Sequence, residues 1–330
     1  LQRLEIAVRG DFPWAEPRWE DVGDRARSAS LSPTGKRALF EARGEIFTVP
    51  AEKGDTRNLT RSSGAADRAP VWSPDGQTIA WVSDSGEGYE LLIAAQDGLS
   101  EPRRLSLGES KMAWEPAWSP DGELIAFVDD DVRIRVLEVE SGDVRTVGVG
   151  GVNIERGRMG LTWSPDSQWL AWARTYDNHL RRIVVWSRDT VEVTPLTDPM
   201  ADAASPAWDR DGLHLYFLAS TDVALGSGWA NTSTMRADPR YGVYLAVLKA
   251  EAETPFTLES DEEEENGDEE SENGEGDHPD RKGSDDDAEG EDEDGDEEEE
   301  EVEVEIDFEG FQRRIVPVPM PVSRYRAVLA

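Results

Sequence analysis

The stretch Trp72-Ser73-Pro74-Asp75-Gly76 decides the fold, because it recurs along the chain at a nearly constant interval. There are five copies, and their second-position residues lie 41, 46, 45 and 45 residues apart. A fixed period in this range is typical of repeat architectures. The other four copies, of which the first and last are degenerate, are Leu31-Ser32-Pro33-Thr34-Gly35, Trp118-Ser119-Pro120-Asp121-Gly122, Trp163-Ser164-Pro165-Asp166-Ser167 and Trp208-Asp209-Arg210-Asp211-Gly212.

The motif reads as a tight turn followed by a strand. Proline presets φ at the second position of a type I turn, Asp or Thr suits the third, and glycine takes the left-handed position that closes a bulged hairpin. An alternating apolar run follows each copy, as in Thr78-Ile79-Ala80-Trp81-Val82, and a second turn leads to a third strand. Four antiparallel strands in about 45 residues predict a propeller blade, so the fold class is all-β.

The spacing predicts five full blades and a partial blade at each end. Residues 1–9 read as the last strand of a preceding blade, and Arg326–Leu329 as the opening of a following one. Val302–Ile306 and Arg313–Pro317 are expected to resume the final strand of the fifth blade. The full blades are predicted at about 27–61, 69–107, 115–148, 160–197 and from Ser205 onward.

Two insertions are expected in the fifth blade, at 221–240 and in an acidic tract. Residues 259–305 hold 29 Asp or Glu against Arg281 and Lys282, and so supply −27 of the net charge of −37. Such a tract cannot support a packed core, so disorder is expected. It is a solubilising insert, an electrostatic filter or docking arm for a basic partner, or a buffer of divalent cations. The domains expected are blades over 1–258, the insertion over 259–301 and a propeller continuation over 302–330.

Composition narrows the function classes. No basic patch stands out, so nucleic acid is not expected as a partner. Cysteine is absent, and no apolar run approaches a membrane span. The first residue is not methionine and both ends read as interrupted strands, so we expect a fragment of a longer protein.

The sequence offers little catalytic chemistry, and no catalytic, cofactor-binding or metal-binding residue is assigned. His278 lies in the acidic tract, His179 is expected in a turn, and His214 alternates with leucines in a strand. A nucleophile elbow is missing, and Gly226-Ser227-Gly228 is a poor substitute. Asp129-Asp130-Asp131 and Asp209-Arg210-Asp211-Gly212 lack the spaced oxygens of a calcium loop. The tryptophans at 72, 118, 163 and 208 are expected to pack between blades.

The repeated turns, followed by Ile-Ala-Trp or Ile-Ala-Phe, resemble the propellers of TolB, of the prolyl oligopeptidase and dipeptidyl peptidase group, and of tricorn proteases. Residues 28–60 are more discriminating, because they resemble the opening of the second propeller of tricorn proteases. The acidic insert followed by Val304-Glu305-Ile306-Asp307-Phe308-Glu309-Gly310 is similar to the same region in those proteins.

This resemblance implies a serine peptidase of the S41 type that forms hexamers in the cytoplasm and cuts peptides. It also implies that the catalytic residues and a PDZ-like domain lie elsewhere, and that this region is a seven-bladed propeller whose channel admits and filters peptides. No cofactor is expected. Two alternatives stay open: a non-catalytic TolB-like binding scaffold, and the propeller of a prolyl-oligopeptidase relative.

Overall fold

The computed structural model describes residues 9–10, 21–62, 64–152, 156–222, 239–252, 254–256 and 302–329. Its strands form five four-stranded antiparallel sheets, each built from consecutive strands, which we call blades 1 to 5. Blades 1 to 3 comprise β1 (Ala26–Leu31), β2 (Arg37–Ala42), β3 (Glu45–Pro50), β4 (Arg57–Asn58); β5 (Arg68–Trp72), β6 (Thr78–Ser83), β7 (Glu90–Ala95), β8 (Arg103–Ser106); and β9 (Ala113–Trp118), β10 (Leu124–Asp129), β11 (Arg133–Glu138), β12 (Val144–Val149).

Blades 4 and 5 complete the set, and two short 3-10 helices accompany the strands. The predicted all-β fold is therefore confirmed. The elements are β13 (Thr162–Trp163), β14 (Trp169–Thr175), β15 (Arg181–Ser187), β16 (Val193–Pro195), β17 (Asp202–Trp208), β18 (His214–Ser220), β19 (Gly242–Val247) and β20 (Ile315–Pro317), with η2 (Gly23–Arg25) and η5 (Phe311–Arg314).

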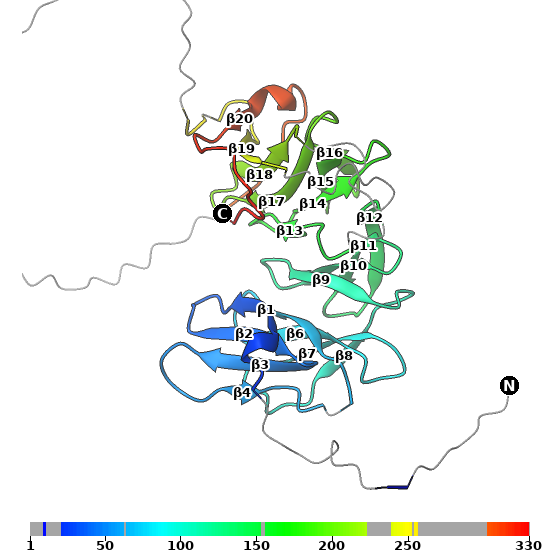
Figure 1. Cartoon of the computed structure of the whole chain (residues 1–330). Helices are drawn as coiled ribbons and strands as arrows, with labels where there is room; N and C mark the ends of the chain where they lie inside the picture. The colour runs from blue at the N-terminus through cyan, green and yellow to red at the C-terminus, as the bar shows by residue number, and fades with distance from the viewer. Residues whose placement is uncertain are drawn as a thin grey trace, which may run out of the picture.

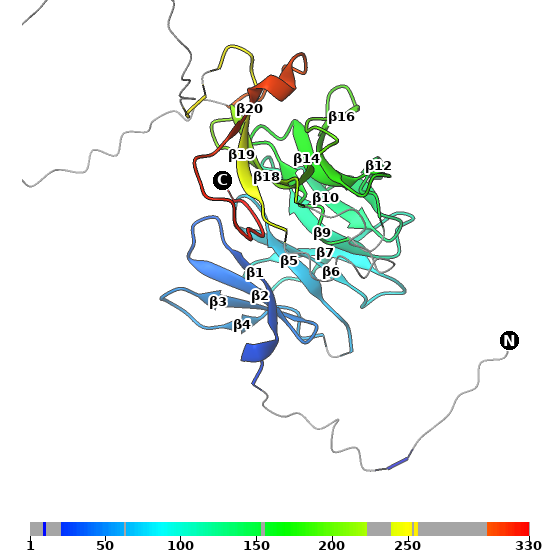
Figure 2. The ribbon, with the colours of Figure 1, turned by 45° about the horizontal axis from the view of Figure 1, so that its top comes forward.

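The blades stand around a central space in an arc that is open between blade 1 and blade 5 (Figures 1 and 2). The first strands of neighbouring blades contact one another, β1 with β5, β5 with β9, β9 with β13 and β13 with β17. The fourth strands lie on the outside of the arc (Figure 1). The strand that precedes each Pro-containing turn is therefore the innermost, a polarity that the sequence left open.

The repeated turn has the geometry that its residues predict. The amide of Gly76 donates to the carbonyl of Ser73 at 2.9 Å, and Gly76 has φ of +67°. The Ser73 hydroxyl lies 2.9 Å from the amide of Thr78, so it ties the turn to the strand that follows. Ser167 takes the same left-handed position without glycine, at φ +64°, and accepts a hydrogen bond from the Asp121 amide of blade 3 at 2.9 Å.

The core consists of apolar layers between adjacent blades. The Trp163 indole is 6% exposed and donates to the carbonyl of Ala117 in the preceding blade at 3.1 Å. The Trp208 indole donates to Thr162 in the same way at 3.2 Å. The expected role of these tryptophans in packing between blades is confirmed for this pair.

The fourth strand of blade 5 comes after the acidic tract in the chain, and β20 pairs with β19. The tract itself lies outside the described residues, as does most of the 221–240 insertion. The predicted domain boundaries stay predictions. The expected strand at 302–306 is wrong: this segment instead packs on the turn of blade 4, where the Val304 amide donates to Asp166 Oδ2 at 2.9 Å and the Trp169 indole donates to the Val304 carbonyl at 2.9 Å.

The predicted strand at 326–329 is also not formed. This segment lies on the inner side of blade 5, where the Val328 amide donates to Ser205 Oγ at 2.9 Å. Further back, Tyr241 and Ser323 form an isolated antiparallel bridge. The expected strand at 1–9 falls almost wholly outside the described residues. Within the described part of the chain, no helix has the length and apolar character needed to cross a membrane.

Candidate functional site

The innermost strands share a backbone feature that their sequences do not announce. The residue three positions before the turn tryptophan, or before Leu31 in blade 1, has a positive φ in all five blades. In β1, β5, β9 and β17 the pairing register also shifts at this point, which is the signature of a β-bulge. These residues are Ser28 (+50°), Ala69 (+50°), Glu115 (+49°), Gly160 (+65°) and Ser205 (+53°).

Each bulge releases amides from the strand ladder, and carboxylates from the preceding blade bind some of them. The Glu115 carboxylate accepts hydrogen bonds from the amides of Met159 (2.8 Å), Gly160 (2.8 Å) and Leu161 (3.3 Å) in blade 4. In blade 1, Glu41 accepts a bond from the Ala69 amide of blade 2 at 3.1 Å. Burial raises the pKa of Glu115 above its usual range, although the three amide donors act to lower it.

Three of the left-handed residues, Glu115, Gly160 and Ser205, line one cavity of about 700 Å³ on the inner side of blades 3 to 5. Arg158 and Arg326 also line it, and both are exposed. The cavity therefore combines strand backbone, a carboxylate and cationic side chains, which are groups that can contact the main chain and side chains of an extended peptide.

Arg181 also lines this cavity, and it forms an ion pair with Asp202 across blades 4 and 5 at 2.6 Å. The Tyr241 hydroxyl donates to Asp202 Oδ2 at 3.0 Å. Burial, with the nearby Asp202 charge, raises the pKa of Tyr241 to about 12, so this hydroxyl stays protonated and keeps donating at neutral pH. The trio fixes the start of β17 to the starts of β15 and β19.

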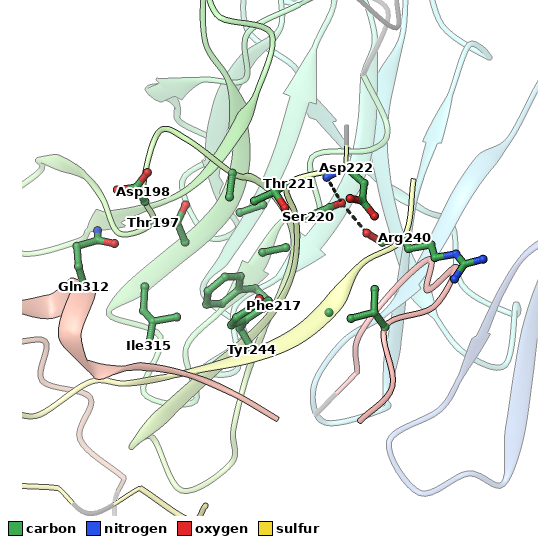
Figure 3. Close-up of a pocket in the computed structure, with 15 residues that line it drawn as sticks. Thr197, Asp198, Phe217, Ser220, Thr221, Asp222, Arg240, Tyr244, Gln312 and Ile315 are labelled. Carbon is green, nitrogen blue, oxygen red and sulfur yellow. Dashed lines mark hydrogen bonds between the residues drawn. The ribbon is translucent and has the colours of Figure 1, made fainter. Parts of the chain in front are cut away.

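A second hollow, of about 390 Å³, lies between blades 4 and 5 at the rim opposite the repeated turns. Its centre is formed by Phe217 and Tyr244, whose rings stack at a centroid distance of 5.9 Å (Figure 3). Asp222 and Arg240 stand on one side of these rings, and Asp198 stands on the other (Figure 3). An apolar centre with a few polar groups at its edge is the usual composition of a ligand pocket.

The two histidines that the structure describes lie apart from both hollows. His214 is 7% exposed, and its Nδ1 lies 3.1 Å from Asp211 Oδ2 and 3.7 Å from Asp209 Oδ2. Among the described residues these three form a group with ligand atoms close enough for one metal ion. His179 is exposed in a turn at φ +61°, as expected. His278 and Gly226-Ser227-Gly228 lie outside the described residues.

Asp129, the first residue of the Asp129-Asp130-Asp131 run, forms buried ion pairs. Its side chain is buried and pairs with Arg133 Nε at 2.6 Å and with Arg135 at 3.6 Å. It also accepts a hydrogen bond from Ser110 at 3.0 Å. The sequence-based expectation of no catalytic, cofactor or metal site stays a prediction. The bulges, by contrast, were missed, because they share no residue type.

Residues 26–330 match the family described as the Tricorn protease second beta propeller domain. Tricorn protease homolog 1 of Streptomyces coelicolor is 29% identical over 361 residues, covering the whole chain but 29% of the relative's own length. The Tricorn protease homolog of Saccharolobus solfataricus is 23% identical and covers 67% of this chain and 19% of that protein.

A solved structure supports the same architecture. The crystal structure of the tricorn protease matches 97% of this chain and 28% of its own, with a TM-score of 0.65 at 15% identity, which is a likeness of fold. The chain thus spans less than a third of the length of these tricorn relatives. With the five blades and the family match over nearly all of its residues, the chain belongs to the family of tricorn protease second β-propeller domains.

Proposed function

We propose that this chain is the substrate-gating propeller of a tricorn-like serine peptidase of the S41 type. The observation that carries the proposal is the inner wall, by which we mean the first strands β1, β5, β9, β13 and β17 facing one central space. A passage lined by strands admits an extended peptide and excludes a folded protein. The family membership favours this function over a TolB-like scaffold or a prolyl-oligopeptidase propeller.

The proposal places catalysis in other parts of a longer protein. The relatives are named as proteases, and this chain corresponds to less than a third of their length. The partners are then peptide substrates, a PDZ-like domain and a peptidase domain of the same polypeptide, and further copies in a hexamer. The location is the cytoplasm, and neither nucleic acid nor a membrane takes part.

A labelling experiment in the parent peptidase tests the gating role. The chain has no cysteine, so Arg158→Cys introduces one thiol into it, on the cavity of the inner wall. Coupling a bulky maleimide there should slow cleavage of long unfolded peptides and leave cleavage of short peptides almost unchanged.

The control is Asp189→Cys, which places the same label on an exposed hairpin between the outer strands β15 and β16. It should leave both substrates unaffected. Equal rates for long peptides with the label at either position would rule out passage along the inner wall.

A further inference from the structure

The hollow between blades 4 and 5 exists because blade 5 departs from a pattern that the other blades keep. The second-strand residue ten positions after the second residue of each turn motif faces a third-strand residue near the rim opposite the turns. In blades 1 to 4 each of these pairs includes a charged side chain, whereas in blade 5 it consists of two small residues. The pairs are Ala42–Glu45, Ser83–Glu90, Asp129–Arg133, Arg174–Arg182 and Ala219–Gly242.

In three other blades the charged residue at this corner of the third strand reaches the segment of the fourth. Glu45 accepts a hydrogen bond from the Thr60 hydroxyl at 2.8 Å. Glu90 pairs with Arg104 at 2.8 Å, and Arg182 donates to the Thr197 carbonyl at 2.7 Å. Gly242 has no side chain to make this link, so the corresponding corner of blade 5 stays open.

The open corner has chemistry suited to a ligand. The half-buried ring of Tyr244, which stacks on the buried Phe217, provides an apolar surface, and Ile315 extends it (Figure 3). Among the described residues that line the mouth, the carboxylates of Asp198 and Asp222 stand against the guanidinium of Arg240. A group that is apolar at its tip and has a cation beside it is complementary to this arrangement.

We infer that this hollow is a binding pocket for a large apolar side chain, aromatic in preference, of an extended peptide that carries lysine or arginine next to it. The inference rests on the proposed function for the class of ligand. It adds a recognition element outside the inner wall, since the pocket lies at the rim between two blades. The side chain enters over the Phe217–Tyr244 stack, and the neighbouring cation lies beside the two carboxylates.

Equilibrium binding tests this inference without any proteolysis. Fluorescence anisotropy of labelled peptides of the pattern Gly-Lys-Xaa-Lys-Gly, with Xaa as Trp, Leu or Ala, should give affinity in that order. Burial of the large side chain predicts a difference of at least about ten-fold between Trp and Ala. Ala219→Leu, which fills the pocket, should bring the Trp peptide to the level of the Ala peptide, and Ala51→Leu on an exposed segment should change nothing.

A second variant keeps the test decisive if Ala219→Leu fails to fold. Asp222→Asn is an exposed, nearly isosteric change that should reduce the advantage of Lys over Gln beside Trp but leave the preference for Trp over Ala. Equal binding of the Trp and Ala peptides, or no binding of either, overturns the pocket. So does Trp binding that neither variant alters. The Arg158→Cys labelling result does not depend on these outcomes, so the pocket and the gating role can fail separately.

Discussion

Glu115 Oε2 accepts a hydrogen bond from the amide of Gly160, the residue that occupies the same left-handed position one blade later, at 2.8 Å. The left-handed residue of blade 3 thus supplies the carboxylate that binds the amides around the left-handed residue of blade 4. The contact joins blades 3 and 4 at the inner wall, where the strand ladder itself leaves these donors unpaired. It turns a local irregularity into a link between repeats.

Replacing Glu115 by Gln is therefore expected to destabilise the chain. The amide side chain has one acceptor oxygen in place of two, so at least one of the three blade 4 amides loses its partner. A buried donor without a partner costs about 1–3 kcal/mol. Urea unfolding at neutral pH measures this loss. The exposed Glu101→Gln is the matched control and should unfold like the wild type.

At Ala69 the backbone is left-handed, with φ of +50°, so a substitution by glycine is not expected to destabilise the fold. A non-glycine residue in this region costs roughly 1–2 kcal/mol, and glycine does not pay it. Ala69→Gly should therefore raise the thermal midpoint slightly or leave it unchanged. In β7, Ala94→Gly should lower the midpoint, because glycine in an ordinary strand destabilises by roughly 0.5–1 kcal/mol. A decrease of equal size in both variants would contradict strain at the bulge.

The contribution of the indole hydrogen bond to stability can be measured by comparing two copies of the same motif. Trp163→Phe removes the bond to the Ala117 carbonyl and part of a buried edge contact with Trp186, so a loss of about 1–3 kcal/mol is expected. Trp118 has a buried indole nitrogen with no hydrogen-bond partner among the described residues. Trp118→Phe should thus cost less, and differential scanning calorimetry of the two variants compares them.

The contact between the Asp121 turn of blade 3 and Arg188 of blade 4 predicts that the stability of the fold depends on pH. Burial acts to raise the pKa of Asp121, but hydrogen bonds from Ser119, the Glu123 amide and Arg188 outweigh it, so the pKa is lowered. A carboxylate whose pKa is lower in the folded state stabilises the fold at every pH above its unfolded pKa of about 4. This contribution is lost as the pH falls through the pKa of the folded state. The stability gap between wild type and Asp121→Asn should narrow as the pH falls below about 5.

The Arg188 side chain provides the control for this pH effect. It lies 2.8 Å from Asp121 Oδ2 and 2.5 Å from Glu123 Oε2. In an Arg188→Gln background the Asp121→Asn substitution should cost less at neutral pH, because one cause of the lowered pKa is gone. Denaturant midpoints measured across the pH range decide this. A gap that stays constant with pH would show that the Asp121 charge does not stabilise the rim.

The repeated turns made the blades predictable, because Pro74 and Gly76 act through local backbone preferences that the sequence displays. The bulges could not be found in this way. Ser, Ala, Glu, Gly and Ser occupy the five equivalent positions, and only the glycine signals a left-handed backbone. The conformation there follows from pairing with the next strand and packing against the next blade, which act across many residues.

The segments after the acidic tract were misjudged for a similar reason. Val302 and Val304 alternate with charged residues, which is the pattern of a strand. The Val304 backbone instead bonds to the Asp166 and Trp169 side chains of the preceding blade. The rim pocket was equally hidden, since it depends on Ala219 facing Gly242 across a register that spans an insertion.

The recurring bulge also separates two properties that evolution can then change independently. The curvature of each inner strand is set by its main-chain path at one position, and that path accepts Ser, Ala, Glu or Gly. Substitutions among such residues can alter the charge and polarity of the surface that faces the central space while the bore stays the same. A propeller built in this way can change which ligands it selects through side-chain substitutions alone, while the width of its central space stays constant.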